Sequence, residues 1–296
     1  MKYFEVEFTL EPCTQDACDL LSALAGEAGF ETFEERGNGL TGYVQQQQFD
    51  QQMLDSVIGS FPLEGTHISY QVREAEDRDW NEQWEQEGFE PICISLPNSK
   101  GKISLVIHDG RHFGDISLDK IPHKIEIDAH MAFGTGTHET TRMICQTLLE
   151  TDVRNWNVLD CGCGTGILGI CALKLGAYNC TAYDIDEWSV ENSRHNAVIN
   201  RVEDSMTILH GDASLFKSLR RTFELVMANI NRNILLQDME HFVNVLRTGG
   251  TLILSGFYKS DCALLESKAQ TLGLTHTRTL TDGEWACMVF KLKKHS

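Results

Sequence analysis

The chain has 296 residues, of which 42% are hydrophobic and 23% charged, a globular composition that can fill one large domain or two ordinary ones. A formal net charge of −18 argues against a nucleic-acid partner, which needs clustered lysine and arginine. No apolar run approaches the roughly 18 residues of a membrane span and the N-terminus does not resemble a signal peptide, so we expect a cytoplasmic protein without a membrane anchor.

The first 74 residues predict a small ferredoxin-like α+β domain. The expected strands and helices alternate in the order β-α-β-β-α-β, which is the split βαβ arrangement. They cover 2–10, 14–29, 31–34, 40–44, 50–58 and 67–72. Residues 1–75 contain 13 acidic and 3 basic residues, a net of −10. This excess is either a solvated acidic face or a surface that docks a basic protein.

A highly charged stretch at 75–89 predicts a connecting helix. Trp80 and Trp84 lie one turn apart on it, and such tryptophans more often pack against a neighbouring domain than bind a ligand. Short apolar runs follow at 92–96, 103–107 and 124–127. We expect them to form a small β layer at the start of the larger domain, which we place at 90–296.

A loop rich in glycine and threonine, residues 132–141, comes next. It has two glycines and four threonines, and it could be a turn before a capped helix. Its position, just before the strand of the ligand site described below, favours instead a wall or lid of that site.

The most informative stretch is a predicted strand that is followed directly by a glycine-rich turn. An apolar run from Asn157 ends at Asp160, and Gly162, Gly164 and Gly166 follow before a helix at 167–175. A strand, a glycine turn and a helix form the entry to a nucleotide-binding α/β unit. Glycines there permit positive φ and a close approach of the ligand, and the helix start presents unpaired N–H groups.

Two acidic residues narrow down the ligand. Asp184 ends the next strand, 180–184, where a carboxylate should meet ribose hydroxyls. Asp160 would repel a pyrophosphate but suits a ligand with positive charge, and S-adenosylmethionine has a ribose, an ammonium and a sulfonium. Gly166 also lies one residue too early for an NAD fingerprint. We therefore predict a methyl-donor site; a glycine turn that merely packs is the alternative.

Cysteine chemistry is not expected at this site. Cys161 and Cys163 lie within the glycine loop, where a metal ion or a disulfide would block the ligand. The ten cysteines include no paired Cys-x-x-Cys spacing, so we expect no bound metal and mostly small apolar side chains in a reducing compartment.

The rest of the chain predicts alternating helices and strands of a mostly parallel sheet. The expected elements cover 188–199, 206–210, 223–228, 234–246, 251–254, 261–272, a strand around 277 and 285–292. A turn at 281–283 indicates a terminal antiparallel hairpin. Asn229 ends one of these strands, and we expect its amide in the same crevice as Gly162 and Asp184, orienting an amine. Alternatively, Asn229 caps the helix that follows.

Several segments together resemble one family. They are Ala132-Phe133-Gly134-Thr135-Gly136-Thr137-His138, Thr140-Thr141, Asp160-Cys161-Gly162-Cys163-Gly164, Asp184-Ile185-Asp186 and Ala228-Asn229-Ile230. They are similar to those of the bacterial ribosomal-protein methyltransferase family PrmA, which methylates protein eleven of the large ribosomal subunit. The resemblance covers residues 80–296 well. It departs at Glu139, where the family usually has proline, and in the residues that follow Asn229.

The resemblance implies a fold, a cofactor and a substrate. The fold would be a Rossmann-like, seven-stranded class I methyltransferase domain preceded by the small domain, which would recognise the ribosomal protein. The cofactor would be S-adenosylmethionine, and the positions that match the family's binding residues are Thr141, Gly162, Asp184 and Asn229. We add Gly164, from the same loop, and Asp160, which is expected to reach the methionine ammonium directly or through water.

The implied reaction is methylation of lysine side chains and the α-amino group, with Asn229 as the catalytic residue that positions the amine. We expect a monomer. Two alternatives stay open: an adenine-N6 or glutamine methyltransferase, which would have Asn-Pro-Pro-Tyr at 229–232, and a non-catalytic scaffold that binds a basic ribosomal protein. An NAD-dependent oxidoreductase fits least.

Overall fold

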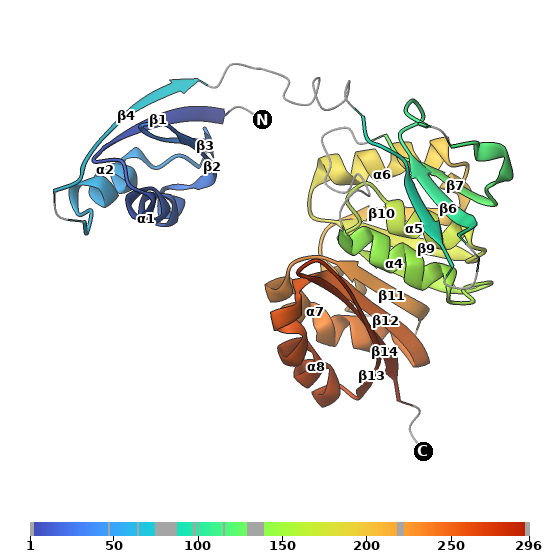
Figure 1. The fold of residues 1–296 in the computed structure, drawn as a ribbon. Helices are drawn as coiled ribbons and strands as arrows, with labels where there is room; N and C mark the ends of the chain where they lie inside the picture. Colours follow the sequence, from blue (N-terminus) through green and yellow to red (C-terminus); the bar gives the residue numbers. More distant parts are fainter. Residues whose placement is uncertain are drawn as a thin grey trace. The chain divides into compact units, whose positions relative to one another are not determined.

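The computed structural model describes residues 3–46, 48–63, 65–74, 88–96, 99, 101–114, 116–128, 139–217 and 222–293. The chain divides into two compact units, Met1–Trp80 and Asn81–Ser296 (Figure 1). The predicted connecting helix at 75–89 lies almost wholly outside the described residues, and the two that are described, Gly88 and Phe89, are not helical. The predicted domain limits at 74 and 90 therefore stay predictions.

The first unit is a four-stranded antiparallel sheet with two helices. Its elements are β1 (Tyr3–Glu11), α1 (Gln15–Ala25), the 3-10 turn η1 (Gly26–Ala28), β2 (Phe30–Arg36), β3 (Gly39–Gln45), α2 (Gln51–Gly59) and β4 (His67–Glu74). The strand order is β2-β3-β1-β4, which confirms the predicted ferredoxin-like arrangement. Alternation along β1 buries Val6, Phe8 and Leu10. Thr14 and Asp50 accept backbone N–H groups at the starts of α1 and α2, as N-caps do.

The second unit contains a seven-stranded sheet. Its elements are α4 (Glu139–Leu149), β8 (Asn157–Cys161), α5 (Ile167–Lys174), β9 (Asn179–Asp184), α6 (Glu187–Ile199), η3 (Glu203–Ser205), β10 (Met206–His210), η4 (Ala213–Phe216), β11 (Phe223–Asn229), α7 (Arg232–Val245), β12 (Leu246–Tyr258), η5 (Lys259–Asp261), α8 (Cys262–Thr271), β13 (Leu274–Asp282) and β14 (Trp285–Leu292). The order is β10-β9-β8-β11-β12-β14-β13, with β14 antiparallel to both of its neighbours. The predicted Rossmann-like sheet with a terminal hairpin is confirmed.

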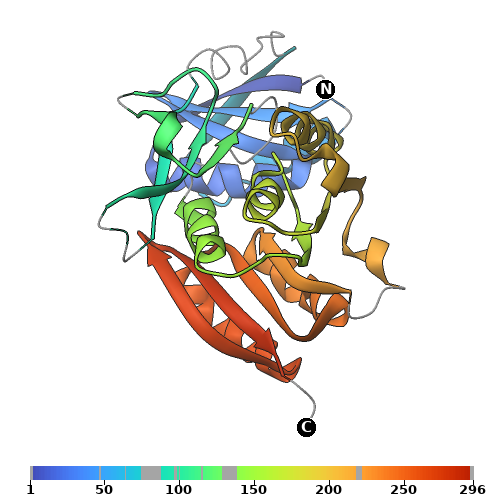
Figure 2. The same cartoon turned by 90° about the vertical axis from the view of Figure 1, so that its right-hand side faces the viewer.

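Helices cover both faces of this sheet. α4, α5 and α6 pack on one face, and α7 and α8 pack on the other (Figures 1 and 2). Along β11, Leu225 and Met227 belong to the first core, whereas Val226 and Ala228 belong to the second. A strand that is buried on both faces reads as a continuous apolar run, which is why β11 was recognisable in the sequence.

A smaller sheet lies against the α4–α6 side. It contains β5 (Ile92–Ser95), β6 (Ile103–His108) and β7 (His123–Glu126), with the 3-10 turn η2 (Leu118–Lys120) before β7. Leu105, Ile107 and Ile125 join the core under α4 and α5, so the predicted β layer is confirmed. Among the described residues, no helix is long and apolar enough to cross a membrane.

The core under α7 generates a stability prediction. Phe242 on α7 is 1% exposed, so Phe242→Ala should lower the free energy of unfolding by about 3–5 kcal/mol, through lost burial and the cavity left behind. Ile234 on the same helix is 38% exposed, and Ile234→Ala should change it by less than about 1 kcal/mol. Denaturant unfolding of both variants checks this; equal losses would contradict the assigned packing of α7.

Candidate cofactor site

Three predicted site residues lie side by side at the carboxyl edge of the large sheet. Cys161, at the end of β8, pairs with Tyr183 on β9 and with Ala228 on β11. Asp184 and Asn229 are the next residues on those two strands. One residue further along, Gly162 therefore falls between Asp184 and Asn229. Sheets of this kind bind their ligands beyond the carboxyl ends of the strands, so the register collects these three residues where a ligand is expected.

The glycine loop requires glycine for steric reasons. Gly162, Gly164 and Gly166 have φ values of 67°, 53° and 79°, a region that residues with a side chain rarely adopt. A Cβ added to Gly162 would lie 2.4 Å from Cγ2 of Ile230. The Gly162 N–H donates to the Tyr183 carbonyl at 2.9 Å, which fastens the start of the loop to β9.

Asp184 is held in place by the backbone. Its Oδ2 accepts the N–H of Gly164 at 2.8 Å, and its Oδ1 accepts the N–H of Asp186 at 3.0 Å. The residue is half-buried. Because a carboxylate has about four acceptor positions, these two bonds leave capacity for hydroxyl donors. Asp184 thus offers a pre-oriented acceptor next to the glycine loop.

Asn229 meets Thr141 from a distant part of the chain. Its Nδ2 donates to Oγ1 of Thr141 on α4 at 3.3 Å, and Thr141 is 2% exposed. The other amide atom of Asn229, Oδ1, is buried and has no hydrogen-bond partner within the described part of the chain. Buried acceptors are nearly always paired, so this oxygen is suited to receive a donor from a ligand.

The alternative role of Asn229, as the cap of the next helix, is wrong. Asn231 occupies the N-cap of α7, and its side chain accepts the N–H of Ile234 at 3.1 Å.

The predicted wall or lid at 132–141 lies mostly outside the described residues; from Glu139 onward it belongs to α4.

Asp160 lies beneath the loop and not on its surface. The residue is 0% exposed, and its Oδ2 accepts the N–H of Gly169 at 2.9 Å. Gly169 is the third residue of α5, and the N-cap of α5, Gly166, has no side chain with which to accept that N–H. Asp160 therefore takes the place of a cap by reaching across from β8. Its predicted contact with a ligand ammonium stays a prediction.

The cysteines of the loop are inert side chains in this environment. Cys161 and Cys163 are buried, and burial raises the pKa of both thiols above the ordinary value, so both stay protonated near neutral pH. No group of three or more His, Cys, Asp or Glu side chains within the described ranges could hold a metal ion.

The structure adds residues that the sequence analysis did not single out. Ile185, directly after Asp184, is 74% exposed at the carboxyl edge. On α6, Ser193 and Asn196 donate to the carbonyls of Gly164 and Thr165. The sequence contained a signal for these contacts. On α6, Asn196 follows Ser193 by three residues and Asn192 by four, a spacing at which the buried face of a helix normally has apolar residues.

The buried Asp160 generates a prediction on pH dependence. Burial raises its pKa from 3.8 to about 7, opposed by the Gly169 N–H and assisted by the Asp184 charge. Between about pH 4 and 7 the folded protein thus binds more protons than the unfolded chain, so the contribution of Asp160 to stability falls as pH rises. Asp160→Asn cannot ionise, and its Tm relative to wild type should increase over this range. A Tm difference that is constant with pH would contradict the assigned burial.

Comparisons with known proteins give a consistent result. The family model described as ribosomal protein L11 methyltransferase (PrmA) matches residues 22–293. The ribosomal protein L11 methyltransferase of Phocaeicola vulgatus is 43% identical over 99% of this chain and 100% of its own length. The corresponding protein of Bacteroides fragilis is 44% identical, again over 99% of this chain and 100% of its own length.

A solved structure agrees with these sequence matches. The crystal structure of a ribosomal protein L11 methylase from Lactobacillus delbrueckii subsp. bulgaricus superposes with a TM-score of 0.59 at 25% identity, covering 68% of this chain and 99% of that one. Since the family model spans most of the sequence and the relatives align over nearly their whole length, the chain belongs to the ribosomal protein L11 methyltransferase (PrmA) family.

Proposed function

We propose that this protein transfers methyl groups from S-adenosylmethionine to amines of ribosomal protein L11, at lysine side chains and the α-amino group. The observation that carries the proposal is the Asn229 amide, which Thr141 holds by its nitrogen while its buried oxygen has no partner in the described part of the chain. The names of the relatives, ribosomal protein L11 methyltransferases, supply the substrate. The reaction would take place in the cytoplasm, by a monomer.

The cofactor side of the site fits S-adenosylmethionine. Asp184 would accept the ribose hydroxyls, because its carboxylate is already fixed and still has acceptor capacity. Gly162 and Gly164 would lie along the methionine part, where the bare backbone allows close approach. Ile185 would offer the exposed apolar surface for the base. The bound cofactor supplies a methyl group on a positively charged sulfur, which an amine can attack directly.

The substrate side of the site requires alignment more than acid–base chemistry. An amine must be neutral to attack, and a free lysine has a pKa of about 10.4. Partial burial at Asn229 would favour the neutral form by desolvation. Oδ1 of Asn229 would accept an N–H of the amine and so direct the nitrogen lone pair, and the bond to Thr141 would keep the amide from rotating.

An aromatic pair near this edge suits a cationic side chain. Tyr258 and Trp285 stack with ring centroids 4.5 Å apart, and Tyr258 is 51% exposed. Tyr258 ends β12 three residues beyond Ser255, which lies opposite Asn229. Aromatic faces attract lysine ammonium groups. Together with the net charge of −18, this supports a basic protein substrate, which the acidic residues 1–74 would help to recognise.

The other methyltransferase class finds little support. Adenine-N6 and glutamine methyltransferases would place Asn-Pro-Pro-Tyr at 229–232, where this chain has Ile230, Asn231 and Arg232 after the asparagine. Asn231 instead caps α7. The scaffold alternative does not account for the buried Asn229 oxygen, which has no hydrogen-bond partner among the residues that the structure describes. Mass spectrometry of the substrate separates this alternative from the proposal.

That experiment is mass spectrometry of purified ribosomal protein L11 after incubation with this protein and S-adenosylmethionine. Mass gains in steps of one methylene equivalent are expected with wild type and should be absent with Asn229→Ala, because the amine is no longer positioned. No gain despite measurable cofactor binding would overturn the substrate assignment. No gain and no binding would leave the scaffold alternative.

The ribose role of Asp184 has a separate test. Asp184→Ala should weaken binding of S-adenosylhomocysteine by about tenfold or more in calorimetry, because a charge-assisted hydrogen bond is lost. The loss should shrink for an analogue that lacks the ribose hydroxyls. Asp186→Ala is the matched control: it removes the N-cap of α6 and should lower Tm while keeping affinity. Unchanged affinity of Asp184→Ala would rule out the ribose contact.

A further inference from the structure

Helix α6 turns polar side chains, in place of apolar ones, toward the interior. Ser189, Asn192, Ser193, Asn196 and Asn200 are each 5% exposed or less. Burying polar groups costs stability unless they are hydrogen-bonded. This row of side chains, which ends at the C-cap Asn200, therefore needs hydrogen-bond partners. Ser189 donates to the N-cap Asp186, and the other four side chains contact two further sets of groups.

One set of partners is the glycine loop. Oγ of Ser193 donates to the carbonyl of Gly164 at 2.9 Å, and Nδ2 of Asn196 donates to the carbonyl of Thr165 at 2.9 Å. Because a peptide group is planar and trans, fixing a carbonyl also fixes the direction of the N–H that follows it. Two successive peptide groups of the loop thus take their orientation from α6.

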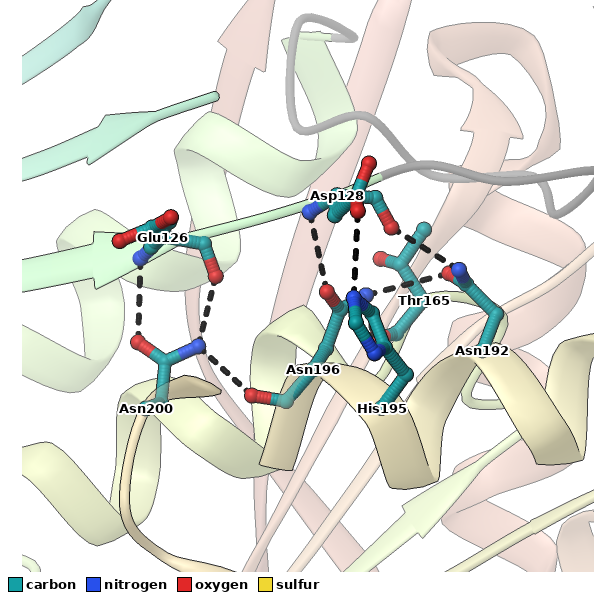
Figure 3. Close-up of polar contacts among 7 residues, drawn as sticks. All are labelled: Glu126, Asp128, Thr165, Asn192, His195, Asn196 and Asn200. Atoms are coloured by element: carbon teal, nitrogen blue, oxygen red, sulfur yellow. Dashed lines mark hydrogen bonds and ion pairs between the residues drawn. The ribbon is translucent and has the colours of Figure 1, made fainter. Parts of the chain in front are cut away.

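The second set of partners is the end of β7 and the residues just after it (Figure 3). Oδ1 of Asn196 accepts the N–H of Asp128 at 2.9 Å, and Nδ2 of Asn192 donates to the carbonyl of Asp128 at 2.9 Å. Asn200 binds both backbone groups of Glu126, at 3.0 and 2.6 Å. The three asparagine side chains, spaced by four residues, thus bind the backbone N–H and carbonyl groups of Glu126 and Asp128, as the backbone of an adjacent strand does in a sheet.

Asn196 alone among these three asparagines contacts both sets of partners. Its two amide hydrogens go to the carbonyl of Thr165 and to Oδ1 of Asn192, the latter at 3.1 Å, while its oxygen accepts from Asp128. A reversed amide would place its oxygen against two acceptors, so this orientation is well determined. Paired buried networks of this kind specify one arrangement of the segments that they join.

We infer that Ser193 and Asn196 are positioning residues for the cofactor, and that Asn196 holds the glycine loop in a fixed relation to the end of β7. The inference rests on the proposed function, since the loop is the segment proposed to bind S-adenosylmethionine. Neither residue is assigned a contact with the cofactor; both act through the carbonyls of the loop.

The test compares Asn196→Ala with Asn200→Ala. Both variants remove an amide from the same buried row and leave backbone groups of the β7 segment unpaired, so both should lower Tm. Only Asn196→Ala also releases the Thr165 carbonyl, so it should weaken S-adenosylhomocysteine binding by about tenfold in calorimetry, with Asn200→Ala close to wild type. With ribosomal protein L11 as substrate, Asn196→Ala should raise the KM for S-adenosylmethionine more than it lowers kcat.

Ser193→Ala is the second variant, because it removes one hydroxyl and is expected to fold. It releases the Gly164 carbonyl without touching the β7 segment, and weakened S-adenosylhomocysteine binding at near wild-type Tm would support the inference. Equal loss of affinity in Asn196→Ala and Asn200→Ala, or full affinity in Ser193→Ala, would overturn it. Wild-type protein that does not bind S-adenosylhomocysteine would instead refute the proposed function itself.

Discussion

The candidate site depends on the parallel register of three adjacent strands, β9, β8 and β11. That register brings Asp184, Gly162 and Asn229 into one row at the carboxyl edge of the sheet. Each contributes a different property: a fixed carboxylate, an uncovered backbone and an amide oxygen without a partner among the described residues. A shift of one residue in either pairing would turn the side chains of Asp184 or Asn229 to the other face of the sheet and disperse the site.

The loop between these strands is stabilised from below and from the side. Asp160 accepts an N–H of α5 beneath it, and α6 holds two of its carbonyls. Both supports are buried polar groups, which are expensive in an apolar interior unless they are paired. The side chains of α6 are paired with the loop, whereas Oδ1 of Asp160 has no hydrogen-bond partner among the described residues. The paired groups of α6 keep their hydrogen bonds only when the loop adopts one conformation, so they specify its shape.

Electrostatics connects the site to its proposed substrate. The net charge of −18 is unfavourable for binding nucleic acid but favourable for the approach of a basic protein. Tyr258, which is exposed and stacks on the partly buried Trp285, ends the strand next to Asn229 and offers an aromatic face to a lysine side chain. Family membership and the charge distribution therefore favour the same class of substrate from independent observations.

The strands, the glycine loop and the helices predicted at 14–29 and 50–58 could be read from the sequence, because periodicity and the positive φ that glycine permits are local properties. Which polar groups are paired depends instead on the tertiary structure. Asn229 donates a hydrogen bond to Thr141, which lies 88 residues away in the sequence, and Asn231 caps α7. Asp160 is buried against Gly169, and α6 reaches the loop with polar side chains. Pairings of this kind depend on contacts between distant segments, which spacing along the chain does not encode.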